Sequence, residues 1–302
     1  MKLKDLEYLV AIDEERHFNK AAERCFVSQP TLSGQLKKLE DELDILLVER
    51  TNRQVKMTEV GVAVANQARR VLAETRVLKE IANSHQDLMA GELHVGLIPT
   101  IAPYLLPLIM PAIKKHCPNL KLWLHEHQTK ILLEKLRNAE LDLLILALPV
   151  QTNEFAELDL FLEPFWLALP SNEDLIAKNK IDLPDIKKQE MLLLEEGHCL
   201  RGQALDICFS AGATEYSGFQ ATSLETLRYM VAEGIGMTLM PELAVPSHTR
   251  KDDPIHYIQF NHPQPSRRIG LLYRKGSYRE TTFITLTEIM RDRVEKSLLK
   301  RK

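Results

Sequence analysis

The chain has 302 residues, of which 45% are hydrophobic and 27% are charged, and its formal net charge is −3. This composition is ordinary for a soluble globular protein, and the length predicts two or three folding units. The negative charge excludes a uniformly basic nucleic-acid-binding protein, so any contact with DNA must come from a locally basic surface. No uncharged apolar run approaches about 18 residues, and the N-terminus carries acidic residues where a signal peptide is apolar, so we expect a cytoplasmic protein with no membrane partner.

The first sixty residues carry the pattern of short amphipathic helices. Apolar residues over 3–12 recur at helical spacing, and Asn19 is predicted to cap a second short helix over 20–26. Ser28 is a good N-cap and a proline is tolerated in the first turn, so a third helix is predicted over 29–43. The predicted buried stripe of this third helix consists of Leu32, Leu36, Leu39 and Leu43.

The third helix is the predicted DNA-reading element. Short polar side chains near its start are of the kind that contact base edges and phosphates in a major groove, although a plain solvated face fits the same pattern equally well. Residues 48–58 look extended and predict a small basic hairpin, in which Arg50 and Arg53 contact the DNA backbone. The predicted contact residues of the helix are Gln29, Pro30, Thr31, Ser33, Gln35 and Lys37.

A long helix is predicted from Thr58 to about Met89. This stretch has no proline and only Gly61, and its apolar residues recur near heptad spacing. Such a helix can pack inside its own chain, but its length favours pairing with a second copy.

From Gly91 onward, strand and helix patterns alternate to the end of the chain. A helix capped by Thr222 or Ser223 is predicted to run through Ala232. The alternation predicts α/β structure with open, mostly parallel sheets, in two subdomains that enclose a crevice. Strands are predicted at 93–97, 120–125, 141–148, 166–169, 191–194, 237–240, 255–260 and 269–273.

Two of the four cysteines, Cys199 and Cys208, lie nine residues apart in a segment that is predicted to begin a helix. In a helix their α carbons are roughly 13 to 14 Å apart, whereas a disulfide needs them within about 7 Å. A bond between them would require the helix to unwind, which would make the pair a redox switch rather than a structural bridge. Of the other two cysteines, Cys25 is predicted to be a core residue and Cys117 a helix-end residue.

The surroundings of the two thiols predict different reactivities. Cys199 occupies a predicted helix N-terminus, which favours an anion such as a thiolate, and His198 and Arg201 can add positive charge. Cys208 lies between apolar residues and is expected to be buried, protonated and slow. Gly202 lowers the stability of the intervening helix by about 1 kcal/mol relative to alanine.

The N-terminal motifs closely resemble the winged helix-turn-helix of LysR-type transcriptional regulators. The resemblance rests on residues 18–22, 28–33, 39–43 and 49–51, and it extends over the whole chain through the long helix and the α/β region. Two positions depart from the family pattern, because Asp44 replaces the usual glycine and Val48 replaces a frequent aromatic residue. Neither lies on the predicted recognition face.

The resemblance implies a three-part organisation. Residues 1–58 would form the DNA-binding domain and 59–90 a linker or dimerisation helix. Residues 91–302 would form a regulatory domain like the periplasmic binding proteins, with subdomain I at about 91–161 and 268–302 and subdomain II at about 162–267. The implied partners are double-stranded promoter DNA, further copies of the same chain in a homodimer or homotetramer, and RNA polymerase.

Residues 197–201 and 208–209 further resemble the peroxide-sensing members of this family. That resemblance implies that hydrogen peroxide oxidises Cys199 to a sulfenic acid, which forms a disulfide with Cys208. The segment between them would refold, alter the geometry of the oligomer and activate antioxidant genes. A thiol reductant, glutaredoxin or thioredoxin, would reset the switch.

Peroxide needs hydroxyl donors beside the reactive thiol. By resemblance, Thr100 and Thr129 are the candidates, and both follow strands at the carboxyl edge where open sheets place ligands, although either can be a plain helix cap. His198 is assigned to the same pocket, and Arg267 is expected to add a positive field.

Two other functions are alternatives to a peroxide sensor. A LysR-type regulator that binds a small metabolite in the crevice would leave the paired cysteines as a coincidence. A thiol peroxidase or disulfide oxidoreductase is disfavoured by the DNA-binding module and by the lack of a Cys-x-x-Cys motif, so we expect no enzyme activity. No cofactor or metal is predicted, since His125 and His127 lack the ligand spacing of a zinc site.

Overall fold

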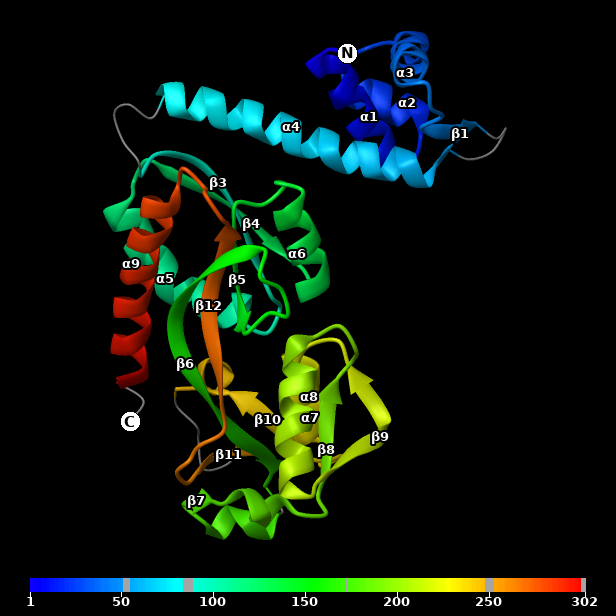
Figure 1. Cartoon of the computed structure of the whole chain (residues 1–302). Helices are drawn as coiled ribbons and strands as arrows, with labels where there is room; N and C mark the ends of the chain where they lie inside the picture. The colour runs from blue at the N-terminus through cyan, green and yellow to red at the C-terminus, as the bar shows by residue number, and fades with distance from the viewer. Residues whose placement is uncertain (51–54, 84–88, 172, 248–252, 300–302) are drawn as a thin grey trace. The chain divides into compact units, whose positions relative to one another are not determined.

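The computed structural model describes residues 1–50, 55–83, 89–171, 173–247 and 253–299 (Figure 1). It divides into two compact units, the first comprising residues 1–87 with 137–140 and the second comprising residues 88–136 with 141–302. No helix among the described residues is both long and apolar enough to cross a membrane.

The N-terminal unit contains the predicted helices and hairpin. Ser28 caps α3 as predicted, because its Oγ accepts a hydrogen bond from the Thr31 amide at 3.3 Å. The prediction that Asn19 caps the second helix is wrong: the helix begins at Phe18, and His17 Nδ1 accepts from the Asn19 amide at 3.2 Å. Phe18 packs against the core of this unit, which explains the earlier start. The elements are α1 Leu3–Glu15, α2 Phe18–Arg24, α3 Gln29–Leu43, β1 Val48–Arg50, β2 Val55–Met57 and α4 Glu59–Asn83.

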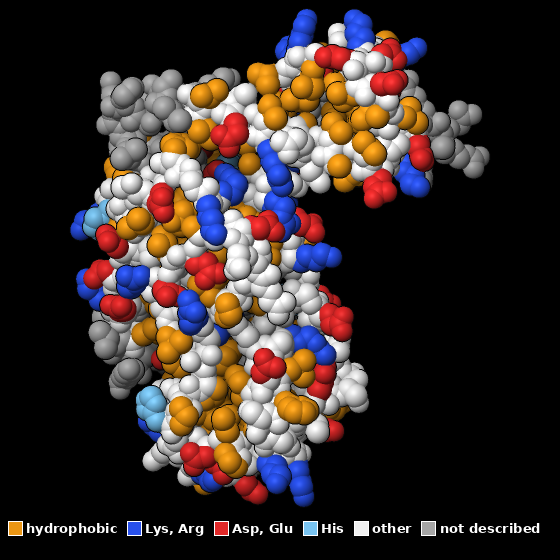
Figure 2. Space-filling model, viewed as in Figure 1, with side chains coloured by type: hydrophobic (Ala, Val, Ile, Leu, Met, Phe, Trp, Pro, Cys, Tyr) orange, Lys and Arg blue, Asp and Glu red, His pale blue; other side chains and the backbone are white. Residues whose placement is uncertain are grey.

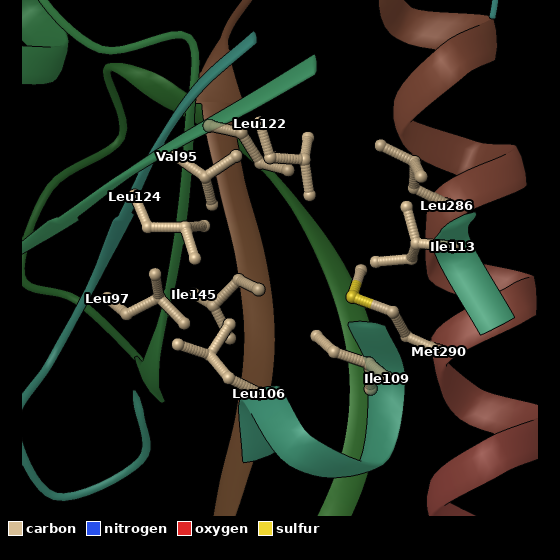
Figure 3. A pocket seen from close by; sticks show the side chains of 11 residues that line it. Val95, Leu97, Leu106, Ile109, Ile113, Leu122, Leu124, Ile145, Leu286 and Met290 are labelled. Atoms are coloured by element: carbon tan, nitrogen blue, oxygen red, sulfur yellow. The ribbon is translucent and has the colours of Figure 1, made fainter. Parts of the chain in front are cut away.

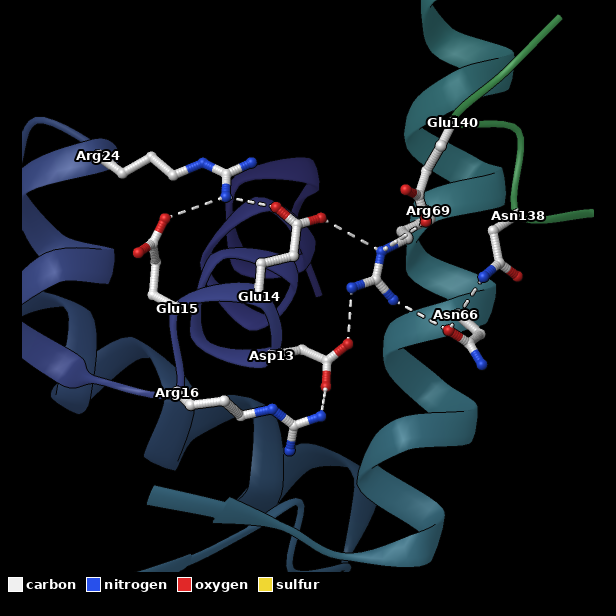
Figure 4. A network of polar contacts seen from close by, with 9 residues as sticks. All are labelled: Asp13, Glu14, Glu15, Arg16, Arg24, Asn66, Arg69, Asn138 and Glu140. Atoms are coloured by element: carbon white, nitrogen blue, oxygen red, sulfur yellow. Dashed lines mark hydrogen bonds and ion pairs between the residues drawn. The ribbon is translucent and has the colours of Figure 1, made fainter. Parts of the chain in front are cut away.

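A network of ion pairs fastens α1 to α2 and α4 (Figure 4). The Arg69 guanidinium of α4 donates to Asp13 Oδ2 at 2.6 Å, and both side chains are nearly buried. Glu14 pairs with Arg69 at 3.4 Å and also with Arg24 of α2. The acidic residues at the end of α1 are therefore neutralised within the unit.

The long helix α4 is described up to Asn83, and the predicted continuation over 84–88 lies outside the described residues. Val60, Val71 and Leu78 of this helix are exposed. Val71 and Leu78 are one heptad apart, as a helix that pairs with another helix requires. Dimerisation through α4 stays a prediction.

The second unit is built on a mixed sheet with the strand order β4-β3-β5-β12-β6-β11-β7, in which β10 also pairs with β6. The pairs that β3 makes with β4 and β5 are parallel, whereas β6 pairs antiparallel with β10, β11 and β12. The expectation of mostly parallel sheets is therefore wrong. The strands are β3 Gly91–Leu97, β4 Leu120–Glu126, β5 Leu143–Leu148, β6 Phe155–Pro170, β7 Lys180–Ile181, β8 Glu190–Leu194, β9 Thr214–Ala221, β10 Thr238–Pro241, β11 Ile255–Phe260 and β12 Ser266–Arg274.

Helices flank this sheet and the smaller parallel pair of β8 and β9 (Figure 1). Ser223 caps α8 as one of the two predicted alternatives, since its Oγ accepts from the Thr226 amide at 3.2 Å. The helices are α5 Ala102–His116, α6 Thr129–Arg137, α7 Cys199–Ala211, α8 Leu224–Ala232 and α9 Glu280–Leu299, with 3-10 turns at Asp174–Ala177, Leu183–Ile186 and Glu242–Ala244.

The second unit has two hydrophobic cores: the first half of β6 and the strand β12 contribute to the first core, and the second half of β6 contributes to the second core. In the first core, side chains of β3, β4 and β5 face those of α5 and α9 (Figure 3). The space left between them is about 10 Å³, which is at the limit of what holds one water molecule. This core is closely packed and offers no room for a metabolite.

Candidate functional site

The two thiols lie at different depths on one helix. Cys199 is the first residue of α7, is half-buried and packs against the first core. Cys208 is 2% exposed in the second core, and burial raises the pKa of its thiol to about 11. Both thiols are free, and nine helical steps hold their α carbons roughly 13 to 14 Å apart. In this conformation they cannot form a disulfide.

The start of α7 lies against the loop that precedes α6. Gly197 has a φ of +97°, and a Cβ built on it would lie 2.4 Å from Gln128 Oε1. A side chain at position 197 would therefore collide with Gln128 as well as strain the backbone. This close approach brings Thr129, which follows Gln128 and begins α6, to the segment that carries Cys199.

Thr129 carries a polar group that the fold does not use. Its Oγ1 is buried and has no hydrogen-bond partner among the described residues. A buried hydroxyl without a partner costs free energy, so such groups occur where a ligand or a water completes the bonding. Thr129 is therefore available to a small polar molecule beside α7.

Thr100 is held by a buried ion pair. The Arg267 guanidinium donates to Thr100 Oγ1 at 3.0 Å and to the Thr100 carbonyl oxygen at 3.1 Å. It also donates to Glu163 Oε2 at 2.7 Å, and neither charged side chain has any exposed surface. Arg267 is thus paired with a carboxylate, and it fixes the position of Thr100 rather than supplying an unpaired positive charge.

Thr100 and Thr129 follow neighbouring parallel strands, as expected. β3 ends at Leu97 and β4 ends at Glu126, and the His127 amide donates to the Leu97 carbonyl at 3.2 Å, which joins the two strand ends. Both hydroxyls consequently belong to the carboxyl edge of this part of the sheet.

His198 and Arg201 supply no unpaired positive charge beside Cys199. His198 is 8% exposed, and burial lowers its pKa below 6.5 despite Glu195 Oε1 at 4.0 Å, so its imidazole is neutral at pH 7. Arg201 donates to both carboxylate oxygens of Glu215 at 2.7 and 2.8 Å and to the Leu194 carbonyl at 2.9 Å. These contacts anchor the first turn of α7 to β8 and β9. The nearby anion-stabilising feature is therefore the N-terminus of α7 itself.

The predicted DNA-contacting residues of α3 do not share one face. Pro30, Thr31 and Lys37 are exposed, whereas the three other predicted residues are partly covered. A spacing of two residues turns through about 200° in a helix, so alternate positions point to different sides. Gly34 and Lys38 are also exposed on α3. The partly covered residues are Gln29, Ser33 and Gln35.

The hairpin after α3 forms as predicted, with Glu49 opposite Lys56. Arg50 lies in β1, and Arg53 lies outside the described residues. Lysine and arginine side chains lie beside aspartate and glutamate on the face of the N-terminal unit drawn in Figure 2. A DNA-binding surface on this unit therefore depends on how individual cations are placed rather than on a large excess of positive charge.

The histidines of β3 and β4 contact one another. His94 Nδ1 and His125 Nε2 are 3.1 Å apart, and the His94 ring also stacks on Trp123. The described residues include no group of three side chains that could hold a metal ion.

Sequence reasoning missed the residues that position the site. Glu163 pairs with Arg267, 104 residues later in the chain, and Tyr104 donates to Glu225 at 2.8 Å between α5 and α8. A single glutamate within the otherwise apolar end of β6 was the available signal for Glu163. Nothing in the local sequence pointed to the Tyr104 contact.

A helix-turn-helix unit with a hairpin, joined to an α/β unit that carries buried polar groups, defines a DNA-binding regulator that responds to a signal. Residues 3–62 match the family model described as bacterial regulatory helix-turn-helix protein, lysR family, and residues 86–295 match the LysR substrate binding domain. The chain belongs to the LysR family of transcriptional regulators, which confirms the predicted α/β architecture with its N-terminal winged helix-turn-helix.

Three relatives are similar over nearly the whole chain. The DNA-binding transcriptional dual regulator OxyR of Escherichia coli K12 is 49% identical, with 98% of this chain and 96% of the relative covered. A hydrogen peroxide-inducible genes activator of Haemophilus influenzae is 50% identical, with 99% of each covered. The structure of full-length OxyR C199D from Pseudomonas aeruginosa has a TM-score of 0.80 and 39% identity, with 96% of this chain and 95% of that chain covered.

Proposed function

We propose that this chain is a peroxide-responsive transcriptional regulator in which Cys199 is the sensing thiol and Cys208 the resolving thiol. The observation that carries the proposal is the placement of both on one helix, with Cys199 half-buried at its start and Cys208 buried further along. The names of the relatives, OxyR and a hydrogen peroxide-inducible genes activator, support peroxide as the signal.

The chemistry has two steps. The Cys199 thiolate attacks one oxygen of hydrogen peroxide, an S–O bond forms as the O–O bond breaks, and the departing hydroxide takes up a proton to become water. The Cys208 thiol then attacks the sulfenic sulfur of Cys199. An S–S bond forms as the S–O bond breaks, and a second water leaves.

The surrounding residues have positioning roles in the first step. Thr129 offers an unused buried hydroxyl to the peroxide, and Arg267 holds the Thr100 hydroxyl in place. His198 directly precedes Cys199 at the start of α7, and its neutral imidazole can donate a hydrogen bond from one ring nitrogen. A hydrogen bond to the departing oxygen lowers the barrier to O–O cleavage.

The second step requires α7 to unwind, because the disulfide needs the two α carbons within about 7 Å. Unwinding withdraws Leu200, Ala204 and Cys208 from the second core. The loss of this packing changes the shape of the regulatory unit. We propose that the oligomer responds with a new arrangement on DNA that activates antioxidant genes.

The proposal includes the partners and the three-part organisation. Residues 1–58 bind promoter DNA, 59–90 pair two copies, and 91–302 sense peroxide, with subdomain II at about 162–267. Homodimers associate into homotetramers that contact RNA polymerase. A cytoplasmic dithiol reductant, glutaredoxin or thioredoxin, attacks the disulfide and restores α7.

The test is footprinting of the full chain on promoter DNA before and after brief exposure to low peroxide, with mass mapping of disulfides. The wild type is expected to form the Cys199–Cys208 disulfide and to change its footprint. Cys199→Ser is expected to bind DNA with the footprint of the reduced protein under both conditions.

Cys208→Ser and Cys117→Ser separate the steps. With Cys208→Ser, a dimedone adduct should mark the sulfenic acid on Cys199 with no internal disulfide. Cys117→Ser removes another buried thiol and should leave the switch intact. If Cys199→Ser still changed its footprint with peroxide, the proposed mechanism would be wrong.

A further inference from the structure

A second pocket lies on subdomain II, away from α7. Its volume is about 640 Å³, within the range of roughly 300 to 1,000 Å³ that is typical of small-molecule sites. Its lining residues come from β6, β7 and β11 and from the segments that adjoin them. These three strands are labelled in Figure 1. The lining residues are Trp166, Asn179, Lys180, Tyr257, Gln259, Phe260, His262 and Gln264.

The floor of the pocket follows from strand register. Gln259 of β11 lies opposite Trp166 of β6 on one side and opposite Lys180 of β7 on the other, so the three side chains form a row on one face of the sheet. Tyr257, two positions before Gln259, shares this face. The neighbours that alternate with Trp166 are buried in the second core, whereas Trp166 and Tyr257 are only partly buried against it.

The lining combines aromatic surface with hydrogen-bonding groups. Trp166 and Tyr257 offer rings for stacking, and the Trp166 Nε1–H has no acceptor among the described residues. Burial raises the pKa of Tyr257, so its hydroxyl stays a donor at neutral pH. The side-chain amide of Gln264 donates to the Phe165 carbonyl at 3.3 Å, which orients it at the rim.

The charge of the lining is positive. Lys180 is exposed and makes no ion pair with any residue that the structure describes, and the lining contains neither aspartate nor glutamate. One lysine with amide donors suits a singly charged carboxylate, whereas polyphosphates are usually held by several cations or a helix N-terminus. The aromatic rings favour a planar ligand.

We propose that this pocket binds a small aromatic carboxylate, with the ring against Trp166 and Tyr257 and the carboxylate on Lys180 and the side-chain amides. The site is separate from the peroxide chemistry and requires no part of it. The regulator would then have a second, non-covalent input on the same domain.

The chain contains two tryptophans, so one substitution makes Trp166 a specific reporter. The probe is benzoate, titrated into full-length Trp123→Phe while the emission of Trp166 is followed. Saturable quenching with an apparent Kd of about 1 mM or tighter is expected. Benzamide, which lacks the charge, and cyclohexanecarboxylate, which lacks the aromatic ring, should each bind at least about tenfold more weakly.

Matched variants in the Trp123→Phe background locate the binding. Lys180→Gln should weaken benzoate at least about tenfold and leave benzamide unchanged, whereas Lys115→Gln, an exposed lysine of α5 outside the pocket, should change neither. Gln259→Glu should abolish benzoate binding by like-charge repulsion, with circular dichroism confirming the fold. No saturable quenching, or quenching that Lys180→Gln does not weaken, would overturn the proposal.

Discussion

At the scale of single residues, the buried pair of Arg267 and Glu163 is the part of the site with the most charge and the least solvent. Two opposite charges out of water are tolerated because each is hydrogen-bonded: Arg267 to Thr100, and Glu163 to the Leu243 amide at 3.0 Å. Removing one partner leaves a buried charge without compensation.

Glu163→Gln should therefore destabilise the regulatory unit by about 3 kcal/mol or more, measured by urea unfolding. Asp159→Asn is the matched control, because Asp159 lies on the same strand and pairs with Arg268 in an exposed ion pair. Its effect should be small, since exposed pairs contribute little. Equal effects of the two changes would contradict a special role for burial.

His198 gives a pH dependence whose sign follows from burial. Its pKa in the folded protein lies below 6.5, so as the pH falls below 6.5 the unfolded chain binds a proton that the folded protein does not. Stability is thus lost on acidification from 6.5 down to the folded pKa. Unfolding at about pH 7.5 and about pH 5.5 should show a smaller loss for His198→Gln than for the wild type. An identical loss would show that His198 is accessible to protons when folded.

Prediction at this scale worked where the signal was local. The spacing of Cys199 and Cys208 already implied two incompatible states, because helical rise is a fixed quantity. The positive charge expected from His198 and Arg201 is absent at His198, which burial keeps neutral, and is paired with Glu215 at Arg201, and local sequence reveals neither the burial nor the partner.

At the scale of elements, α7 must be stable enough to form and weak enough to open. Gly202 lies in its first turns, and a Cβ built there meets nothing within 4 Å. Alanine would fit without strain and would raise helix stability by about 1 kcal/mol. The folded helix therefore contains a replaceable weak point between the two thiols.

Gly202→Ala should slow disulfide formation about fivefold at equal peroxide, because the open state of α7 becomes rarer by that factor. Rapid-quench alkylation with mass analysis measures the rate. Gly34→Ala is the matched control, since Gly34 also lies in a helix, with nothing within 4 Å of an added Cβ. If Gly202→Ala formed the disulfide at the wild-type rate, opening of α7 would not limit the switch.

Most helices and strands were predictable, because the spacing of apolar residues and the capping residues can be recognised within a short stretch of sequence. The first half of β6 was missed, although its burial alternates, because Glu157 and Asp159 interrupt the apolar pattern on the outer face. The direction of β6 and β12 was also misjudged. Strand order and direction depend on pairing between distant segments, for which alternation of strands and helices is a weak guide.

At the scale of the whole molecule, the residues proposed to sense peroxide all lie in the second compact unit, and the recognition helix lies in the first. Contacts that position Thr100 and the start of α7, which carries Cys199, come from β6, β8, β9 and β12 of the same unit. The sensing reaction should thus be independent of DNA binding, while the output is not.

A fragment of residues 88–302 should form the Cys199–Cys208 disulfide at a rate within about twofold of the full chain, because a compact domain with its own core folds alone. Stopped-flow oxidation of both proteins measures this. A fragment that unfolds cooperatively but fails to oxidise would show that the N-terminal unit contributes to the reaction.

The burial of Cys208 affects how the regulator responds to different concentrations of peroxide. The sulfenic acid on Cys199 waits for α7 to open, and during that time a second peroxide molecule can carry it to the sulfinic acid, which does not form the disulfide. Opening is independent of peroxide concentration, whereas the second oxidation rises in proportion to it. The slow opening of α7 therefore sets an upper limit on the useful peroxide concentration. Above that limit, Cys199 is converted to the sulfinic acid and the regulator is inactivated instead of activated.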